Sequence, residues 1–256
     1  MIGSAWEYDE TTGEYYLHLF AKEQPDLNWE HPPVVKAVHD IIRFWLDKGV
    51  DGFRMDVINF ISKDQAFPDA PIDDPDRVWQ WGHMHYGNGP RLHEHLQNIG
   101  KILKEYDAFS VGEMPCTQDG EEILRAVGQD RGELNMIFQF DHVVIDHGQH
   151  DKFVPTQWPL TSLKSLLGKW QNFMYSNGGW NALFWENHDV PRSIDRYTGA
   201  KPEYGATASK MLATVLLLMS GTPFIYQGEE LGMRNVPKEW GMEKYKDIEC
   251  LNHWHR

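Results

Sequence analysis

The chain has 256 residues, of which 41% are hydrophobic and 13% aromatic, so it can bury a substantial core and is not disordered. Its formal net charge is −14, which argues against nucleic acid and anionic membranes as partners. These properties suit a soluble protein that acts on a neutral small molecule.

The N-terminal residues and the cysteine content do not suggest export. The first ten residues lack the basic and apolar regions of a signal peptide. The longest apolar stretch, 211–219, is too short to span a bilayer. We therefore expect a cytoplasmic protein. Cys116 and Cys250 permit one disulfide but exclude a disulfide framework.

Residues 6–20 predict a β-hairpin, with Thr12 and Gly13 near its turn. Residues 1–30 contain no strand–helix unit. We therefore expect residues 1–30 to form a segment distinct from residues 31–256.

Helical and strand patterns alternate from Pro32 onward. The predicted helices span residues 32–48, 92–106, 121–127, 160–175 and 203–219. The predicted strands span residues 50–58, 108–114, 136–141, 180–187 and 221–230. Such alternation predicts an α/β fold with a parallel sheet, and both a doubly wound sheet and a (β/α)₈ barrel fit it.

The position of the polar residues favours the barrel. Each predicted strand ends in charged or amide residues: Asp56, Glu113, Asp141, the group 186–189, and Glu229. Polar groups at the carboxyl ends of successive strands form the active-site face of a (β/α)₈ TIM barrel. Five of the eight strands are found, so the sequence predicts a partial barrel.

Two of these strand ends predict a pair of carboxylates. Arg54 and Asp56 are two residues apart on a strand and face the same side, where the guanidinium would keep the carboxylate ionised. Glu113 ends the next strand. Retaining glycoside hydrolysis uses two carboxyl groups about 5–5.5 Å apart. The structural alternatives are a buried Arg–Asp pair and a solvated loop glutamate, and spacing alone does not decide between them.

His188 and Asp189 follow a strand with an apolar body. At the mouth of the same barrel they could hydrogen-bond sugar hydroxyls, although a lone histidine is more often a structural residue.

Three motifs in this order, GFRMDV, VGEM and ENHD, resemble short conserved regions of the α-amylase family of glycoside hydrolases. The flanking segments resemble the oligo-1,6-glucosidase and maltase branch of that family: YYLHLF, QPDLNWEHP, FQFDH and GTPFIYQGEELGM. The likeness runs through essentially the whole chain. Each motif alone is weak evidence, but three in the right order are specific.

The resemblance implies a role for each matching residue. Asp56 matches the nucleophile and Glu113 the general acid/base, while Asp189 matches a third carboxylate that holds sugar hydroxyls. Arg54 matches the arginine that pairs with the nucleophile, and His188 a histidine that contacts the glucosyl unit. The implied reaction hydrolyses terminal α-glucosidic bonds of short oligosaccharides in two steps, with retention of configuration.

Two further residues are assigned to substrate binding by resemblance. Phe20 stands where relatives place an aromatic residue beside the pocket. Val57 follows the nucleophile, where an aliphatic residue resembles enzymes that cleave α-1,6 links such as isomaltose, and threonine resembles strict maltases. The alternative is that Val57 simply packs behind the strand.

The chain also departs from the family pattern. The first three barrel strands, the region with an Asp and a His near the third strand, the calcium-binding loop of some members and the C-terminal β domain are all missing. The predicted strands therefore match strands 4 to 8 of the barrel. The resemblance thus implies that residues 1–30 are the remnant of an inserted subdomain and that residues 31–256 form the C-terminal part of the catalytic (β/α)₈ barrel. No cofactor is expected, and calcium only in a full-length parent. Because a barrel closes only with all its strands, we expect this chain by itself to be unstable or inactive.

Other functions stay open. Trehalose-6-phosphate hydrolases and sucrose isomerases share these motifs. A non-catalytic relative would have lost its carboxylates and would carry a membrane segment, and a truncated product would have no function of its own. Metal binding is not expected at the clustered histidines His83, His85, His93 and His95, which no cysteine accompanies. The expected partner is an oligosaccharide, and the sequence leaves the oligomeric state open.

Overall fold

The computed structural model describes residues 3–148, 152–199 and 201–255. Its contacts divide the chain into two compact units. One unit comprises Met1–Phe53 with Val57–Ala108, and the other comprises Arg54–Asp56 with Phe109–Arg256. The segment Arg54–Asp56 therefore clusters with the later strands and not with its neighbours in the chain. The domain boundary at residue 30 stays a prediction.

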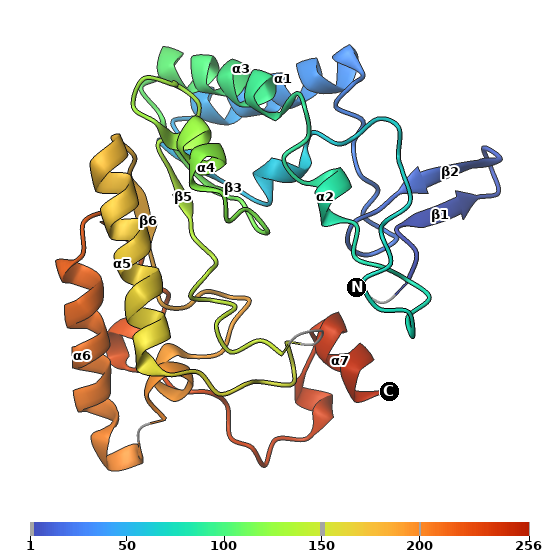
Figure 1. Cartoon of the computed structure of the whole chain (residues 1–256). Coiled ribbons are helices and arrows are strands. Elements are labelled where there is room, and N and C mark those ends of the chain that lie inside the picture. Colours follow the sequence, from blue (N-terminus) through green and yellow to red (C-terminus); the bar gives the residue numbers. More distant parts are fainter. Residues whose placement is uncertain (1–2, 149–151, 200, 256) are drawn as a thin grey trace. The chain divides into compact units, whose positions relative to one another are not determined.

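The first unit begins with the expected hairpin (Figure 1). Strand β1 (Trp6–Asp9) pairs antiparallel with β2 (Glu14–Leu17), in a register that sets Trp6 opposite Leu17. Gly13 closes the turn with a φ of 73°, a left-handed conformation that glycine adopts without steric cost. The predicted hairpin is thus confirmed.

The first unit also contains helices. They are α1 (Pro32–Asp47), α2 (His83–Tyr86) and α3 (Leu92–Glu105), with a 3₁₀ turn at Ile58–Phe60. Figure 1 shows α1 and α3 side by side. An Arg43–Glu105 ion pair of 2.9 Å joins them, and the Tyr106 hydroxyl donates to Asp47 Oδ1 over 2.8 Å.

The second unit contains most of a five-stranded sheet. Its strands are β3 (Gly52–Met55), β4 (Phe109–Glu113), β5 (Met136–Phe138), β6 (Asn181–Leu183) and β7 (Thr222–Pro223). They lie in the order β3-β4-β5-β6-β7, and β4 to β7 pair in parallel. A doubly wound sheet reverses its strand order, whereas a barrel follows chain order. The sheet is therefore part of a (β/α)₈ barrel.

Helices follow the later strands. They are α4 (Gly120–Val127), α5 (Leu160–Asn177), α6 (Gly205–Leu218) and the short α7 (Ile248–Trp254). A π-helical turn spans Ile194–Thr198, and 3₁₀ turns span Pro202–Tyr204, Glu229–Leu231 and Met242–Lys244. The predicted helices are confirmed to within a few residues at their ends. The predicted strands were too long, because the residues that follow Met55, Phe138, Leu183 and Pro223 leave the sheet and enter loops.

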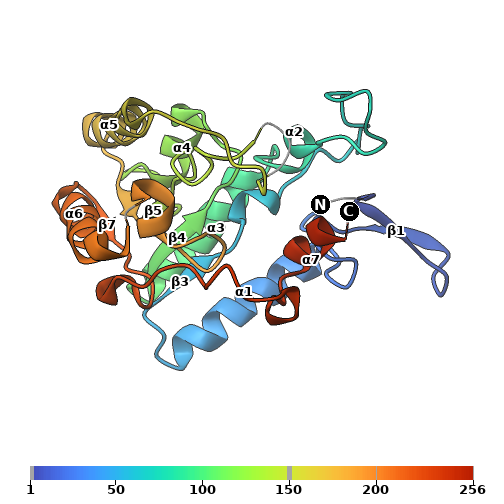
Figure 2. The ribbon, with the colours of Figure 1, turned by 90° about the horizontal axis from the view of Figure 1, so that it is seen from below.

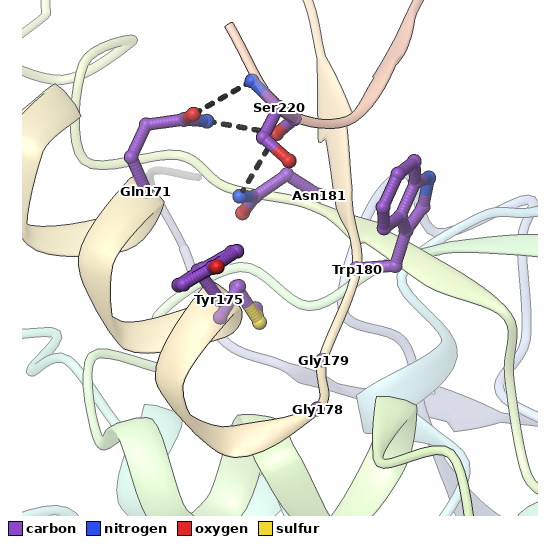
Figure 3. A pocket seen from close by; sticks show the side chains of 8 residues that line it. Gln171, Tyr175, Gly178, Gly179, Trp180, Asn181 and Ser220 are labelled. Atoms are coloured by element: carbon purple, nitrogen blue, oxygen red, sulfur yellow. Dashed lines mark hydrogen bonds between the residues drawn. The ribbon is translucent and has the colours of Figure 1, made fainter.

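The two faces of the sheet bury different residues. Helices α5 and α6 lie beside one another in both views (Figures 1 and 2). They bury a cluster with the β6 segment: Leu163, Leu183, Trp185, Ile194, Ala208, Leu212 and Leu216. A second cluster gathers Val111, Met136 and Ala182 with Phe138 and Phe224. Because side chains alternate along a strand, these two clusters occupy opposite faces.

Within the residues that the structure describes, no helix has both the length and the apolar character needed to cross a membrane. Cys116 and Cys250 are both free thiols.

Candidate active site

Arg54 connects two carboxylates at the carboxyl ends of β3 and β4. Its Nη1 lies 2.8 Å from Asp56 Oδ1, and its Nη2 pairs with Glu113 Oε1. Asp56 follows the last residue of β3, and Glu113 is the last residue of β4. Neighbouring parallel strands end at the same edge of a sheet, so the two carboxylates that the sequence placed on separate strands come together.

Glu113 is the buried member of this pair. It is 5% exposed, and its sheet register pairs it with Phe138. The Phe138 ring packs edge-to-face on Phe184 and Phe224, with centroids 5.0 and 4.8 Å away. Burial is the main cause that raises the pKa of Glu113 to about 7, a hydrogen bond between its carboxyl and that of Asp56 adds to the rise, and the charge of Arg54 opposes it.

Asp56 has the opposite environment. Its side chain is 69% exposed, against 7% for that of Glu113, while Arg54 touches both. One carboxyl group of the pair therefore lies in a setting that favours its protonated form, and the other is open to water and to a ligand. Unequal environments of this kind are how two carboxylates acquire different chemical roles.

His188 and Asp189 lie in the loop after β6. His188 Nε2 is 3.3 Å from Asp189 Oδ2, and both side chains are well exposed. The Asp189 amide donates to Asn187 Oδ1 over 2.9 Å, which closes a tight local turn. The loop thus presents an imidazole and a carboxylate at the carboxyl edge of the same sheet, with β5 between β6 and β4.

Phe20 and Val57 belong to the first unit, so their predicted contact with substrate stays a prediction. Phe20 is exposed. Val57 was expected in a strand over residues 50–58, and this was wrong. The strand ends at Met55, and Val57 has a φ of 33°, which is rare for a β-branched residue.

Some of the polar residues near the strand ends have structural roles. Asp141 accepts a 2.8 Å hydrogen bond from Trp170 Nε1 and pairs with Lys169 at 3.4 Å, so it holds α5 on the sheet. Glu186 is 3% exposed and pairs with Arg192 at 2.7 Å. The sequence did not reveal the Glu186–Arg192 pair, since six residues separate its members and neither belongs to a regular element.

Glu229, which lies near the end of the last predicted strand, belongs to a 3₁₀ turn after β7. It is partly buried, which raises its pKa to about 7, and the nearby charge of Glu186 adds to the effect. Its Oε2 accepts a 3.0 Å hydrogen bond from the Tyr226 amide. Across the described ranges of the chain, no group of three or more His, Cys, Asp or Glu residues is arranged to hold a metal ion.

Comparison with known proteins agrees with this geometry. Residues 1–253 match the alpha amylase catalytic domain family. The chain is 56% identical over 253 residues to an alpha-glucosidase of Schizosaccharomyces pombe, and 50% identical over 252 residues to an oligo-1,6-glucosidase of Halalkalibacterium halodurans. Each alignment covers 98% of this chain but 44% of the relative, so the chain spans less than half their length.

A solved structure supports the same conclusion. A mutant isomaltulose synthase from Erwinia rhapontici NX5, in complex with its natural substrate sucrose, superposes with a TM-score of 0.90 at 36% identity. The superposition covers 99% of this chain and 44% of the synthase. The strand order, the Arg54-bridged carboxylates and these similarities agree that the chain belongs to the alpha-amylase family and carries part of its catalytic domain.

Proposed function

We propose that this chain carries the catalytic centre of a retaining α-glucosidase that hydrolyses terminal α-glucosidic bonds of short oligosaccharides. The observation that carries the proposal is the Asp56–Arg54–Glu113 cluster, in which the buried carboxyl has a pKa of about 7. Such a pair is what glycoside hydrolysis requires: one group that holds a proton at neutral pH and one that is open to the substrate.

In the first step the Asp56 carboxylate attacks the anomeric carbon and forms a glycosyl ester. The bond to the leaving oxygen breaks as Glu113 gives that oxygen its proton. In the second step Glu113, now a carboxylate, takes a proton from water. The water oxygen bonds to the anomeric carbon, and the Asp56 carboxylate leaves. Two inversions at one carbon keep the α configuration.

The closeness of the two carboxyls supports retention over inversion. Arg54 is ion-paired with both groups, and a hydrogen bond from Asp56 is among the causes that raise the pKa of Glu113, so the two carboxyls lie close to one another. An inverting enzyme needs about 6.5–9.5 Å between them to hold a water molecule in line with the bond that breaks. Arg54 contacts both groups and so orients the nucleophile while keeping the pair together.

The other assigned residues bind the sugar in this proposal. His188 and Asp189, exposed beyond β6, hydrogen-bond hydroxyls of the glucosyl unit. Phe20 keeps the substrate-binding role that the resemblance gives it. Val57, directly after the nucleophile, favours α-1,6 over α-1,4 links, so isomaltose is the preferred substrate and maltose the second.

The first test measures glucose release from isomaltose and maltose by this chain and by its Asp56→Asn variant. The unchanged sequence and Asp56→Asn are also tested in a completed chain. The completed chain joins this sequence to those segments of the Schizosaccharomyces pombe relative that lie outside the match. Asp130→Asn removes an exposed carboxylate elsewhere and is the matched control. Trehalose-6-phosphate and sucrose, assayed alongside, test the related activities.

We expect the completed chain to hydrolyse isomaltose, Asp130→Asn to keep that activity and Asp56→Asn to abolish it. An equally active Asp56→Asn variant would refute the nucleophile. Turnover of trehalose-6-phosphate or conversion of sucrose, without isomaltose hydrolysis, would replace the proposed substrate by a related one. Activity of the 256-residue chain alone would refute the expectation that it cannot work by itself.

A further inference from the structure

We propose that Arg192 is a positioning residue that sets the place of Asp189 by tying the segment after β6 to the segment after β7. The role of Asp189 in catalysis rests on the proposed function above, but the tie is a property of the fold. Within the described residues, the side-chain contacts of Arg192 are with Glu186, Gln227, Met233 and Tyr226 and not with the Arg54-bridged carboxylates, so its effect would be indirect.

On the β6 side, Glu186 bonds to residues at the other end of the loop that follows β6. Its Oε1 accepts a 2.7 Å hydrogen bond from Arg192 Nη1, and its Oε2 accepts one from the Ser193 amide. Residues 187–191, which include His188 and Asp189, form the arc between these contacts. Glu186 is almost fully buried, so the carboxylate depends on both donors for its solvation.

On the β7 side, the same guanidinium holds the following segment. Arg192 Nη1 also donates to the Gln227 carbonyl over 2.8 Å, and the guanidinium lies over the Tyr226 ring, 4.9 Å from its centroid. The Arg192 amide donates to Asn235 Oδ1 over 2.7 Å. One residue therefore contacts both segments through its side chain and its backbone.

A second pair parallels this tie. Asp195, in the π-helical turn after the loop, accepts 2.7 Å hydrogen bonds from Arg234 Nε and from the Asn235 amide. Gly228 allows the close approach, because its φ is 87° and a Cβ there would meet the Met233 sulfur and lie 3.3 Å from Arg192 Nη2. The segment after β6 and the segment after β7 are therefore joined by several contacts and not by one alone.

The planar guanidinium matters as well as the charge. It donates to a carboxylate and a carbonyl while its face covers an aromatic ring, which a lysine ammonium cannot reproduce. Loss of the tie would free the arc that holds Asp189. A displacement of about 1 Å in a substrate-positioning group costs roughly 100-fold in rate.

The experiment compares Arg192→Gln and Arg192→Lys with Arg131→Gln in the completed chain. Arg131 pairs at 2.6 Å with Glu133, another buried carboxylate, away from these loops, so its variant controls for loss of a buried ion pair. We expect kcat on isomaltose to fall about 100-fold in Arg192→Gln, with only slight recovery in Arg192→Lys. Arg131→Gln keeps its kcat even where its Tm falls.

A double variant tests the route of the effect. If Arg192 acts through Asp189, then Asp189→Asn combined with Arg192→Gln is no slower than Asp189→Asn alone. Losses that multiply would overturn the proposal, as would an Arg192→Gln variant with wild-type kcat while Asp56→Asn is inactive.

Hydrogen exchange separates this proposal from the proposed function. In the chain as sequenced and in the completed chain, the amides of residues 187–190, 192 and 193 should lose protection in Arg192→Gln and keep it in Arg131→Gln. If no isomaltose is hydrolysed by any form, the proposed function fails and this measurement alone decides on the tie. Unchanged protection of those amides in Arg192→Gln would overturn it.

Discussion

Replacing Glu113 by glutamine is expected to remove a pH-dependent loss of stability along with catalysis. Burial raises the pKa of Glu113 from its ordinary 4.5 to about 7. The fold therefore favours the protonated carboxyl. This contribution to stability is complete below pH 4.5 and is lost as pH rises through 7. Each pKa unit is worth about 1.36 kcal/mol, so ionisation of Glu113 costs about 3 kcal/mol between these limits.

Glutamine keeps the size and hydrogen-bonding capacity of the protonated carboxyl but cannot ionise. Above pH 7 the Glu113→Gln variant should therefore be more stable than the wild type by about 3 kcal/mol relative to their difference at pH 4.5. For a chain of 150–250 residues this corresponds to roughly 6–12 °C in Tm. Glu239→Gln, at an exposed position, is the matched control and should show no such trend.

The assay is thermal unfolding of the three proteins at half-unit steps from pH 4.5 to pH 9, in the chain as sequenced and in the completed chain. Parallel Tm curves for the wild type and Glu113→Gln would refute the reasoning, because they would mean that Glu113 is not desolvated in the fold. A gap that opens in the opposite direction would mean that Arg54 outweighs burial.

Three further predictions concern the site and the core. Because the positive charge of Arg54 lowers the pKa of Glu113, Arg54→Leu should move the basic limb of the kcat/KM profile of the completed chain to higher pH; a limb that stays or moves down would contradict this. Leu216 is 1% exposed between α6 and the sheet, so Leu216→Ala should cost about 2–5 kcal/mol in the free energy of unfolding, measured by urea titration. The Gly89 amide donates to the Ser62 carbonyl over 3.0 Å, and a Cβ at Gly89 would collide with that carbonyl. Gly89→Ala should therefore lower Tm by several degrees, whereas an unchanged Tm would show that the backbone can shift freely.

Hydrophobic periodicity and motif order predicted much of this fold. Helical spacing located α1, α3, α5 and α6, because an amphipathic helix repeats its buried face every three to four residues whatever packs on it. The Trp6–Leu17 hairpin was visible because its turn needs glycine at a left-handed position. Strand ends were less readable, since apolar residues continue from a strand into the loop that packs beside it.

The candidate site was predictable only as a set of residues. Arg54, Asp56 and Glu113 could be named because strand alternation and motif order place their carboxylates at one edge of a parallel sheet. Spacing left open whether each was catalytic or structural. It also missed that Val57 leaves the strand in a left-handed conformation, because nothing in a β-branched residue signals a positive φ.

The sequence by itself determined the alternation of elements, the family and the identity of the paired carboxylates, since these depend on local pattern and on order along the chain. Tertiary structure alone decided which carboxyl is buried, with a raised pKa, and which is exposed. Glu113 is buried where β4 pairs with β5, opposite Phe138 in the sheet register, whereas the Asp56 side chain is exposed, and strands that are distant in the sequence create that difference. It likewise decided that Glu186 and Arg192 join two loops, because the energy of a buried charge depends on the partners that folding brings to it.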